Sequence, residues 1–241
     1  MEHGDQREAW EAWYSGQPRP WKGTADLGWV RFTPGERVLD AGCGNGKTSE
    51  TLMDLGCEVT GVDISGSAVA ECSRRFGSRG RFICGDVCCL PFENSTFDTV
   101  VSVHCLEHTT YENEPLALSE FRRILVPGGR LVLQMFAFGD FRSEGRSDDV
   151  RNGILYRYHT EDSIRVALSG WNVSFFETDE SRTRFGTVRR RFHIVAETDR
   201  RCPTPKTASR ICCYSIWELD GSSSKICIVK FEVRLQNLQI I

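Results

Sequence analysis

The sequence predicts an α/β fold in which helices cover both faces of a mostly parallel sheet. Two short apolar runs, Val38-Leu39 and residues 58–63, each lead into an acid, and a glycine-rich turn at 42–46 separates the first run from a segment, 47–55, of helical composition. Apolar residues bounded by turn signals indicate buried strands. Strands that alternate with helices are typical of a parallel, doubly wound sheet.

The glycine-rich turn is the most informative of these elements. Residues 38–46 read VLDAGCGNG, so Gly42, Gly44 and Gly46 lie between a strand and a helix. Glycine allows backbone conformations and close approaches that a Cβ forbids. Such a turn also presents free N–H groups, with the helix N-terminus behind them, to a ligand. The sequence therefore predicts a ligand-binding turn at 42–46.

Two acids indicate the kind of ligand. Asp63 ends the second strand about 20 residues beyond the glycines, where a doubly wound fold places the carboxylate that binds ribose hydroxyls. Asp40, directly before the turn, would repel a pyrophosphate. It suits a ligand that brings positive charge, such as an amino-acid ammonium group. We therefore expect a nucleotide-like ligand with a cationic end.

At these residues the chain resembles the class I S-adenosylmethionine-dependent methyltransferases, of the small-molecule, type 11/25-like kind. Their first motif is a strand that ends in Asp or Glu and is followed by GxGxG. Further matches are the run into a strand at 97–103 and the helix, Pro-Gly-Gly turn and strand over 119–133. The resemblance implies a Rossmann-like fold with a seven-stranded, mostly parallel sheet, an antiparallel last strand and helices on both faces. It also implies S-adenosyl-L-methionine as the methyl donor.

The resemblance also implies, residue by residue, how the donor is held. The turn and the acid before it would line the methionine end, Asp63 would hold both ribose hydroxyls, and Ile64 would pack on the adenine. Asp86, after a third strand at 81–83, would accept the adenine amino group, and Val87 would offer its N–H to the ring. The cofactor-binding residues expected in this way are Asp40, Gly42, Cys43, Gly44, Asp63, Ile64, Asp86, Val87, His104 and Trp21.

The N-terminal stretch contains two features that precede the turn. Residues 5–14 carry aromatic side chains at helical spacing, which predicts an amphipathic helix that packs over the sheet. Residues 17–24 contain Pro-Arg-Pro-Trp. In the thiopurine methyltransferase-like and tellurite-resistance relatives a Pro-Trp segment covers the cofactor, so Trp21 would face the sulfonium through a cation–π contact. A plain linker is the alternative for this segment.

His104 and His108 follow the strand at 97–103 and are the candidate catalytic residues. Histidine titrates near neutral pH, so either ring suits a general base. Ubiquinone O-methyltransferase-like and small-RNA 2′-O-methyltransferase proteins carry Glu-x-x-Glu-His here and bind a divalent ion. This chain has His104 at the first position, so the oxygen-rich ligand set around Glu107 and His108 is incomplete and we expect no metal. Structural packing beside the cofactor is the third interpretation.

The segment 138–158 breaks periodicity, as functional or disordered long loops do. Tyr156, Arg157 and Tyr158 interleave aromatic and basic character, which would suit a planar or anionic acceptor, and they are the candidate substrate residues. The alternative is a loop that leads into a helix capped at residues 160–163. Residues 171–177 and 189–197 alternate as two strands and match the family's final antiparallel hairpin.

Five arginines lie in or beside this hairpin and raise the question of nucleic acid. Such a cluster can bind phosphates, whereas the acids around it favour a balanced, solvated hairpin. RNA is therefore a possible partner and a small molecule the preferred one. The arginines are Arg182, Arg184, Arg189, Arg190 and Arg191.

Length and composition favour one enzyme-sized domain with appendages. The net charge over 241 residues is −3, which excludes an overall polycation. No apolar run approaches the roughly 18 residues of a membrane span, and the first residues are unlike a signal peptide. We expect an N-terminal helix and cofactor-covering segment at 1–34, the methyltransferase domain at 35–199, and an extension of unknown role at 200–241. Within that extension, 225–235 reads either as a strand or as a poorly ordered segment.

The eleven cysteines are odd in number and form no CxxC pair. Seven of them lie in or beside expected core elements, so buried thiols are favoured over disulfides or zinc, and a reducing cytoplasm is expected. Together these features predict methyl transfer, by SN2 displacement, to an unidentified small molecule. The alternatives are an RNA (tRNA) methyltransferase and a non-catalytic S-adenosylmethionine-binding protein.

Overall fold

The computed structural model describes residues 6–17, 20, 23–200, 213–216 and 228–231. The chain divides into two compact units, Met1–Cys202 and Pro203–Ile241. In the second unit, β10 (Cys213–Ile216) pairs antiparallel with β11 (Ile228–Phe231) in a two-stranded sheet of its own. Of the two readings of 225–235, the strand is present as β11, and the rest of that segment lies outside the described residues.

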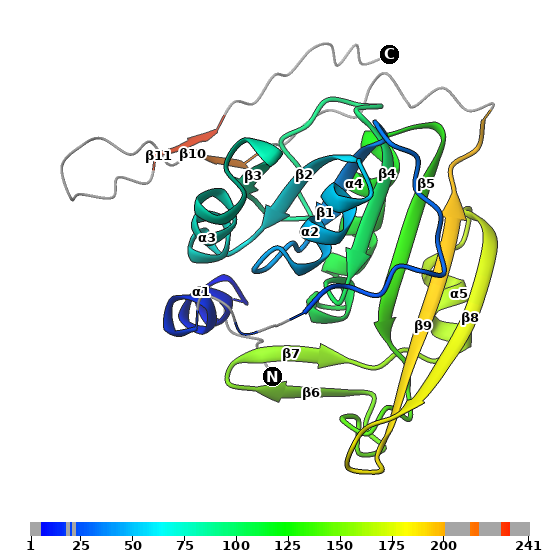
Figure 1. Ribbon diagram of the computed structural model, residues 1–241. Coiled ribbons are helices and arrows are strands. Elements are labelled where there is room, and N and C mark those ends of the chain that lie inside the picture. Colours follow the sequence, from blue (N-terminus) through cyan, green and yellow to red (C-terminus); the bar gives the residue numbers. More distant parts are fainter. Residues whose placement is uncertain (1–5, 18–19, 21–22, 201–212, 217–227, 232–241) are drawn as a thin grey trace, which may run out of the picture. The chain divides into compact units, whose positions relative to one another are not determined.

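A seven-stranded sheet forms the centre of the first unit (Figure 1). Its order is β3-β2-β1-β4-β5-β9-β8, and β3 to β5 run parallel, whereas β9 is antiparallel to both of its neighbours. This confirms the predicted mostly parallel, Rossmann-like sheet. Its strands are β1 (Arg37–Ala41), β2 (Glu58–Asp63), β3 (Gly80–Cys84), β4 (Phe97–Val103), β5 (Leu125–Phe136), β8 (Asn172–Arg182) and β9 (Val188–Glu197).

Helices cover both faces of this sheet because each buried strand is apolar on both sides. Val100 and Leu131 belong to one hydrophobic cluster, together with residues of α4 and α5, and their chain neighbours Val101 and Val132 belong to a second, with residues of α2 and α3. Successive side chains of a strand point to opposite faces, so both faces need cover. The helices are α1 (Gln6–Gly16), α2 (Lys47–Asp54), α3 (Gly66–Phe76), α4 (Asn113–Ile124) and α5 (Glu161–Ala167), with short 3₁₀ turns η1 (Gly77–Arg79) and η2 (Leu106–His108).

The helix expected after residue 160 begins as the sequence predicts. The Thr160 hydroxyl accepts from the Ser163 N–H at 3.1 Å, and the Ser163 hydroxyl accepts from the Thr160 N–H at 3.0 Å, which completes a capping box. The Pro-Gly-Gly segment differs slightly from the expected turn, because β5 already begins at Leu125 and runs through it. The register opposite β4 shifts between Phe97 and Thr99, and this irregularity accommodates the segment.

A hairpin that the sequence analysis missed lies within 138–158. β6 (Asp148–Arg151) and β7 (Ile154–Arg157) pair antiparallel around Asn152 and Gly153, whose φ angles are 53° and 79°. Asn-Gly between two strands is the signature of a tight type I′ turn, which needs positive φ at both central residues. The signal was therefore present in the sequence, and β6–β7 replaces the irregular loop expected there.

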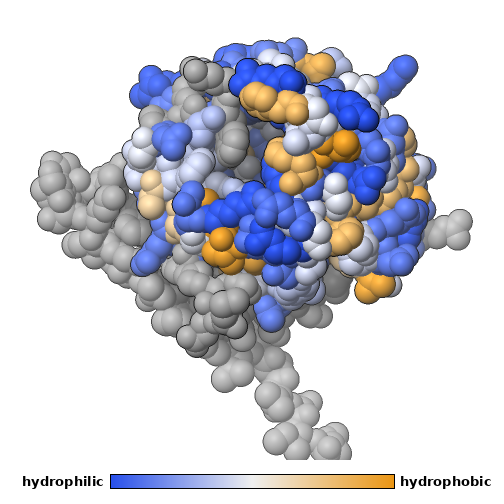
Figure 2. Space-filling model, turned by 90° about the horizontal axis from the view of Figure 1, so that it is seen from below, coloured by the Kyte–Doolittle hydropathy of each residue, from blue (hydrophilic) through white to orange (hydrophobic). Residues whose placement is uncertain are grey.

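Two expectations drawn from composition can be compared with the structure. The seven cysteines whose side chains the structure describes are free thiols, and Cys43, Cys57 and Cys72 among them are buried. None of the helices in the described part of the chain is long and apolar enough to cross a bilayer. Figure 2 views the molecule from below, the side of the β6–β7 hairpin in Figure 1, and shows hydrophobic residues interspersed with hydrophilic ones.

Candidate functional site

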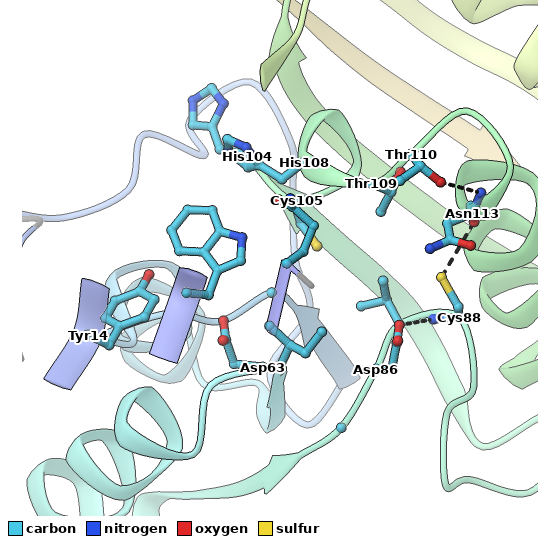
Figure 3. A pocket seen from close by; sticks show the side chains of 16 residues that line it. Tyr14, Asp63, Asp86, Cys88, His104, Cys105, His108, Thr109, Thr110 and Asn113 are labelled. Carbon is cyan, nitrogen blue, oxygen red and sulfur yellow. Dashed lines mark hydrogen bonds between the residues drawn. The ribbon is translucent and has the colours of Figure 1, made fainter. Parts of the chain in front are cut away.

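A pocket opens at the carboxyl ends of the parallel strands, where doubly wound folds bind their ligands. Gly42 follows β1, Asp63 ends β2, Asp86 follows β3 and His104 follows β4, and all four line it. Its empty space, including the part open to solvent, is about 710 Å³. In Figure 3, Asp63 and Asp86 lie along one edge of the pocket and His104 and His108 along another.

The glycines of the 42–46 turn are required by the packing of the chain itself. Gly42 has a φ of +74°, and a Cβ added to it would lie 2.6 Å from the Cys105 side chain. Gly44 has a φ of +50°, and its added Cβ would lie 2.3 Å from the Tyr14 hydroxyl of α1. Of the turn, Gly42 lines the pocket, whereas Cys43 and Gly44 lie behind that surface.

Two backbone hydrogen bonds hold the Asp63 carboxylate in the pocket. Its two oxygens accept from the backbone N–H groups of Gly44 at 2.8 Å and Ser65 at 2.9 Å. Burial raises the pKa of Asp63 to about 6, although those backbone hydrogen bonds lower it. The carboxylate is thus fixed in place and ionised at neutral pH.

Asp40 lies beneath the turn and does not line the pocket. It is 1% exposed and accepts a hydrogen bond from the Ser49 hydroxyl at 2.5 Å. Burial, with a smaller contribution from the nearby Asp63 charge, raises the pKa of Asp40 to about 7 against the opposing effect of the Ser49 hydrogen bond. Asp40, Cys43 and Gly44 thus do not line the pocket. The role expected for them at the methionine end of the donor stays a prediction.

Replacing Asp40 with Asn should change how the stability of the protein depends on pH. A carboxyl group with a raised native pKa binds its proton more tightly when folded, so the native state loses stability as pH rises from roughly 4 to 7. Asn does not titrate, and its amide oxygen can still accept from Ser49. The free energy of unfolding of the variant, relative to the original chain, should rise by about 2–3 kcal/mol between pH 5 and pH 8. Urea denaturation at both pH values measures this, and an equal difference at both would contradict it.

The three residues expected to contact the adenine lie together in the pocket. Ile64, Asp86 and Val87 all line the pocket. Asp86 accepts from the Cys88 N–H at 2.8 Å, which closes a tight turn after β3 and fixes the carboxylate. Trp21, the remaining cofactor candidate from the N-terminal stretch, lies outside the described residues.

The two candidate catalytic histidines also line the pocket, in different settings. Nδ1 of His104 lies 2.7 Å from a carboxylate oxygen of Glu107. Nδ1 of His108 lies 2.6 Å from the Leu155 carbonyl oxygen, so it carries the proton and donates. Burial lowers the pKa of His108, despite the Glu107 charge. Among the described residues, no group of three or more His, Cys, Asp or Glu side chains is placed to hold a metal ion.

Of the three candidate substrate residues, Tyr156 and Arg157 lie on β7 and Tyr158 directly follows it; none of them lines the pocket. Tyr156 packs its ring edgewise on His108, with ring centroids 4.7 Å apart. Arg157 points the other way, as strand alternation requires, and binds the Glu114 carboxylate at 3.0 Å. Tyr158 is 3% exposed. The hairpin therefore positions Tyr156 behind a lining residue and buries the other two.

The Arg157–Glu114 pair should be worth far more to stability than an exposed pair. Its two side chains are 5% and 9% exposed, and removing one partner of a buried pair leaves the other charge uncompensated. Glu114→Ala should lower the free energy of unfolding by about 3–5 kcal/mol. Glu161→Ala is the control, because its pair with Arg165 is about half exposed and should cost roughly 0.5 kcal/mol or less. Similar losses in the two variants, measured by urea denaturation, would refute this assignment.

Helix α1 contributes lining residues that the sequence analysis assigned to packing alone. Gln6, Trp10 and Tyr14 all line the pocket. Their spacing of four residues places them on one face of the helix, a signal visible in the sequence, but where the helix docks is a tertiary property.

Contacts at the start and in the middle of α1 hold it over the site. Gln6 donates to the Gly153 carbonyl at 3.1 Å and accepts from the Leu155 N–H at 3.0 Å. Glu11 accepts from the Ser65 hydroxyl at 2.8 Å and the Ser67 N–H at 3.1 Å. Helix α1 is thereby joined to the β6–β7 hairpin and to the N-terminus of α3.

The arginines of the β8–β9 hairpin are partly neutralised by acids of the same hairpin. Arg190 pairs with Glu180 at 2.6 Å and Arg191 with Asp179 at 2.5 Å. This arrangement favours the balanced, solvated hairpin over a phosphate-binding patch. None of these arginines lines the pocket.

Part of the chain matches a known protein family. Residues 39–133 match the family described as "Methyltransferase domain". The demethylmenaquinone methyltransferase of Renibacterium salmoninarum is 38% identical over 136 residues, which are 53% of this chain and 54% of that protein. The chain spans about half the length of the curated relatives it matches.

Solved structures share the fold. One, a SAM-dependent methyltransferase from Methanosarcina mazei, has a TM-score of 0.64 at 22% identity and covers 74% of this chain and 99% of its own. Another is a [4+2]-cyclase, with a TM-score of 0.55 at 21% identity, covering 70% of this chain and 77% of its own. The same fold thus occurs in proteins described by different reactions.

Proposed function

We propose that this chain, whose residues 39–133 match the methyltransferase-domain family, binds S-adenosyl-L-methionine and transfers its methyl group to a small-molecule acceptor. The observation that carries the proposal is the ionised, buried Asp63 carboxylate at the end of β2, facing a pocket that Ile64, Asp86 and Val87 also line.

The residues present fit this cofactor. Asp63 is the group for the ribose hydroxyls, Ile64 and Val87 supply apolar contact for the adenine, and Asp86 is an acceptor for its amino group. Gly42 leaves open the space in which a side chain would meet Cys105. The cofactor, when bound, supplies an electrophilic methyl group on a sulfonium.

What the protein adds is alignment and a dry site. A well-oriented pair of reactants gains about 7–11 kcal/mol at the upper limit from pre-paid entropy, so the chain needs chiefly to hold the acceptor in line with the methyl group. Helix α1 lines the pocket through Gln6, Trp10 and Tyr14, and a closed site of this kind would keep water from the reacting atoms. His104 lies across the pocket from Asp63 and Asp86 (Figure 3), which supports assigning it to the acceptor side.

The charges at the pocket support a small acceptor over RNA. The described residues that line it include no Lys or Arg, while Asp63 and Asp86 contribute two carboxylates. A polyanion would find no partner there. The free buried thiols of Cys43, Cys57 and Cys72 support a reducing compartment such as the cytoplasm.

A second candidate is binding of the cofactor without methyl transfer. The fold similarity to a protein described as a [4+2]-cyclase supports keeping it, because the same architecture is named there for a different reaction.

A transfer assay with methyl-labelled S-adenosylmethionine, offered to separate metabolite, protein and RNA pools, tests the proposal. Label in the metabolite pool, lost in Asp63→Ala and kept in the exposed-site control Asp54→Asn, is the expected result. Label only in RNA would refute the small-molecule acceptor, and cofactor binding without label in any pool would favour the second candidate.

A further inference from the structure

We propose that His104 and Glu107 form a proton-accepting pair, and that the acceptor is a neutral planar molecule with an acidic hydroxyl, a phenol or an enol. His104 takes the hydroxyl proton and Glu107 positions the ring. This inference rests on the proposed function and adds the acceptor class and the residue that activates it.

The pair is built into the fold. Glu107 is fully buried in η2, and its Oε1 accepts from the Phe136 N–H at 3.2 Å as well as lying 2.7 Å from Nδ1 of His104. Burial raises the pKa of Glu107, but the hydrogen bond from His104 and the nearby His104 and His108 rings lower it below its ordinary value. The carboxylate is therefore ionised and can only accept. Nδ1 of His104 consequently carries a proton, which leaves the lone pair of the neutral ring on Nε2.

The backbone holds His104 in an uncommon conformation for this purpose. Its φ is +56°, in the left-handed region that favours glycine, and its N–H donates to the Gln134 carbonyl at 2.8 Å. The ring stacks on Phe136 with centroids 4.3 Å apart. Such strain persists only where the surroundings over-determine it, and it concentrates at functional sites. Glu107 and Phe136 thus hold the ring, and the side chain remains 29% exposed.

The free nitrogen of His104 is available to a ligand. The ring lines the pocket, and Nε2 has no hydrogen-bond partner among the described residues. His108 differs, because its Nδ1 binds a backbone carbonyl and no carboxylate. A positive charge on the His104 ring therefore has a directly bonded counter-ion, and one on the His108 ring has none.

The charges around His104 define the acceptor class. Glu107 and His108 adjoin it on η2, Asp63 and Asp86 lie across the pocket, and Arg142 lies 4.7 Å from the Phe136 ring. Arg142 is itself paired with Asp140 at 2.9 Å. Since no cation lines the described pocket, an acceptor that arrives as an anion is not stabilised there. An acceptor that arrives with its proton needs a base, and the edge-to-face rings of Trp10 and His108, with centroids 5.0 Å apart, suit a flat molecule.

The step balances in atoms and charge. The hydroxyl proton of the acceptor moves to Nε2 of His104, and the oxygen electron pair forms the bond to the methyl carbon. The carbon–sulfur bond breaks with its electron pair kept on sulfur. One positive charge leaves the sulfur and one appears on the imidazolium, where the Glu107 carboxylate stabilises it.

The tautomer of His104 can be tested before any natural acceptor is known. Long-range ¹⁵N–¹H correlation of histidine-labelled protein, saturated with S-adenosylhomocysteine and assigned with His104→Gln, reports which ring nitrogen is protonated. We expect the proton of the neutral ring on Nδ1 and a bare Nε2. A proton on Nε2 of His104 would overturn the assignment.

A matched pair of probe acceptors tests the chemistry. 2-Naphthol must lose its proton to react at pH 8, whereas 2-naphthalenethiol, with the same ring system, is largely ionised there. Glu107→Gln and His104→Gln should each lower kcat/KM for 2-naphthol by about 100-fold or more and for the thiol by much less. Glu161→Gln, on exposed α5, should change neither.

Three results would count against the inference. Equal losses of kcat/KM for both probes would show that the pair is merely structural. An unchanged kcat/KM for 2-naphthol would show that the pair takes no part in the reaction. A protein that labels the metabolite pool but neither probe would refute the acceptor class and leave the proposed function standing. If S-adenosylhomocysteine does not bind at all, it is the proposed function that fails.

Discussion

Replacing Asp63 with Asn is expected to weaken the binding of S-adenosylhomocysteine by about 100-fold. Asp63 already accepts from the N–H groups of Gly44 and Ser65, and both of its oxygens remain beside the pocket. Asn offers one acceptor oxygen and turns an N–H₂ group toward one of those donors. Hydrogen bonds to a charged group contribute about 1.5–3 kcal/mol each, so the loss of one of the two bonds to the ribose hydroxyls corresponds to roughly 10- to 150-fold. Titration calorimetry measures it.

Asp54→Asn is the matched control for this experiment. Asp54 ends α2 and pairs with Arg79 in a bridge whose side chains are both more than half exposed, so its loss should leave the affinity within about twofold. Thermal melting of both variants separates a lost contact from a lost fold. If Asp63→Asn binds as tightly as Asp54→Asn, the ribose role of Asp63 is wrong.

Gly42→Ala should strongly destabilise the glycine turn. The residue has a φ of +74°, and the new Cβ would lie 2.6 Å from both Cβ and Sγ of Cys105. Left-handed backbone costs about 1–2 kcal/mol for a residue with a Cβ, and overpacking a rigid site adds about 1–3 kcal/mol. We expect a loss of roughly 2–5 kcal/mol in the free energy of unfolding by urea denaturation.

Gly186→Ala separates the two causes. Gly186 has a similar φ of +81°, but nothing lies within 4 Å of its added Cβ. Its loss should therefore be the backbone cost alone, about 1–2 kcal/mol. Adding Cys105→Gly to Gly42→Ala removes the two nearest atoms and should recover part of the larger loss. Equal losses at Gly42 and Gly186 would mean that contact with Cys105 does not limit this turn.

The predictable part of the fold is the part encoded by local pattern. β1, the glycine turn, α2 and β2 follow one another within about 30 residues, each with its own signal, and the capping box at Thr160 begins α5 as expected. The β6–β7 hairpin was not predicted, because the prediction for this segment rested on its aromatic and basic composition and did not use Asn152-Gly153, the dipeptide that makes the turn.

The candidate site likewise has one part that local sequence pattern predicts and another that it does not. Asp63, Asp86 and His104 gather in one pocket because the carboxyl ends of parallel strands meet at one edge of a sheet, which the strand assignments alone imply. The docking of Trp10 over that edge depends on contacts between distant segments, which no local pattern encodes. The same limit explains Arg157, since composition does not reveal which side of a hairpin faces the pocket.

A crystal structure of the chain with S-adenosylhomocysteine tests the central claim most directly. The account predicts electron density for the ligand in the pocket at the ends of β1, β2 and β4. Both ribose hydroxyls should lie within hydrogen-bond distance of the Asp63 carboxylate, and the adenine should lie between Ile64 and Val87. A ligand bound elsewhere, or with its ribose out of reach of Asp63, would contradict it.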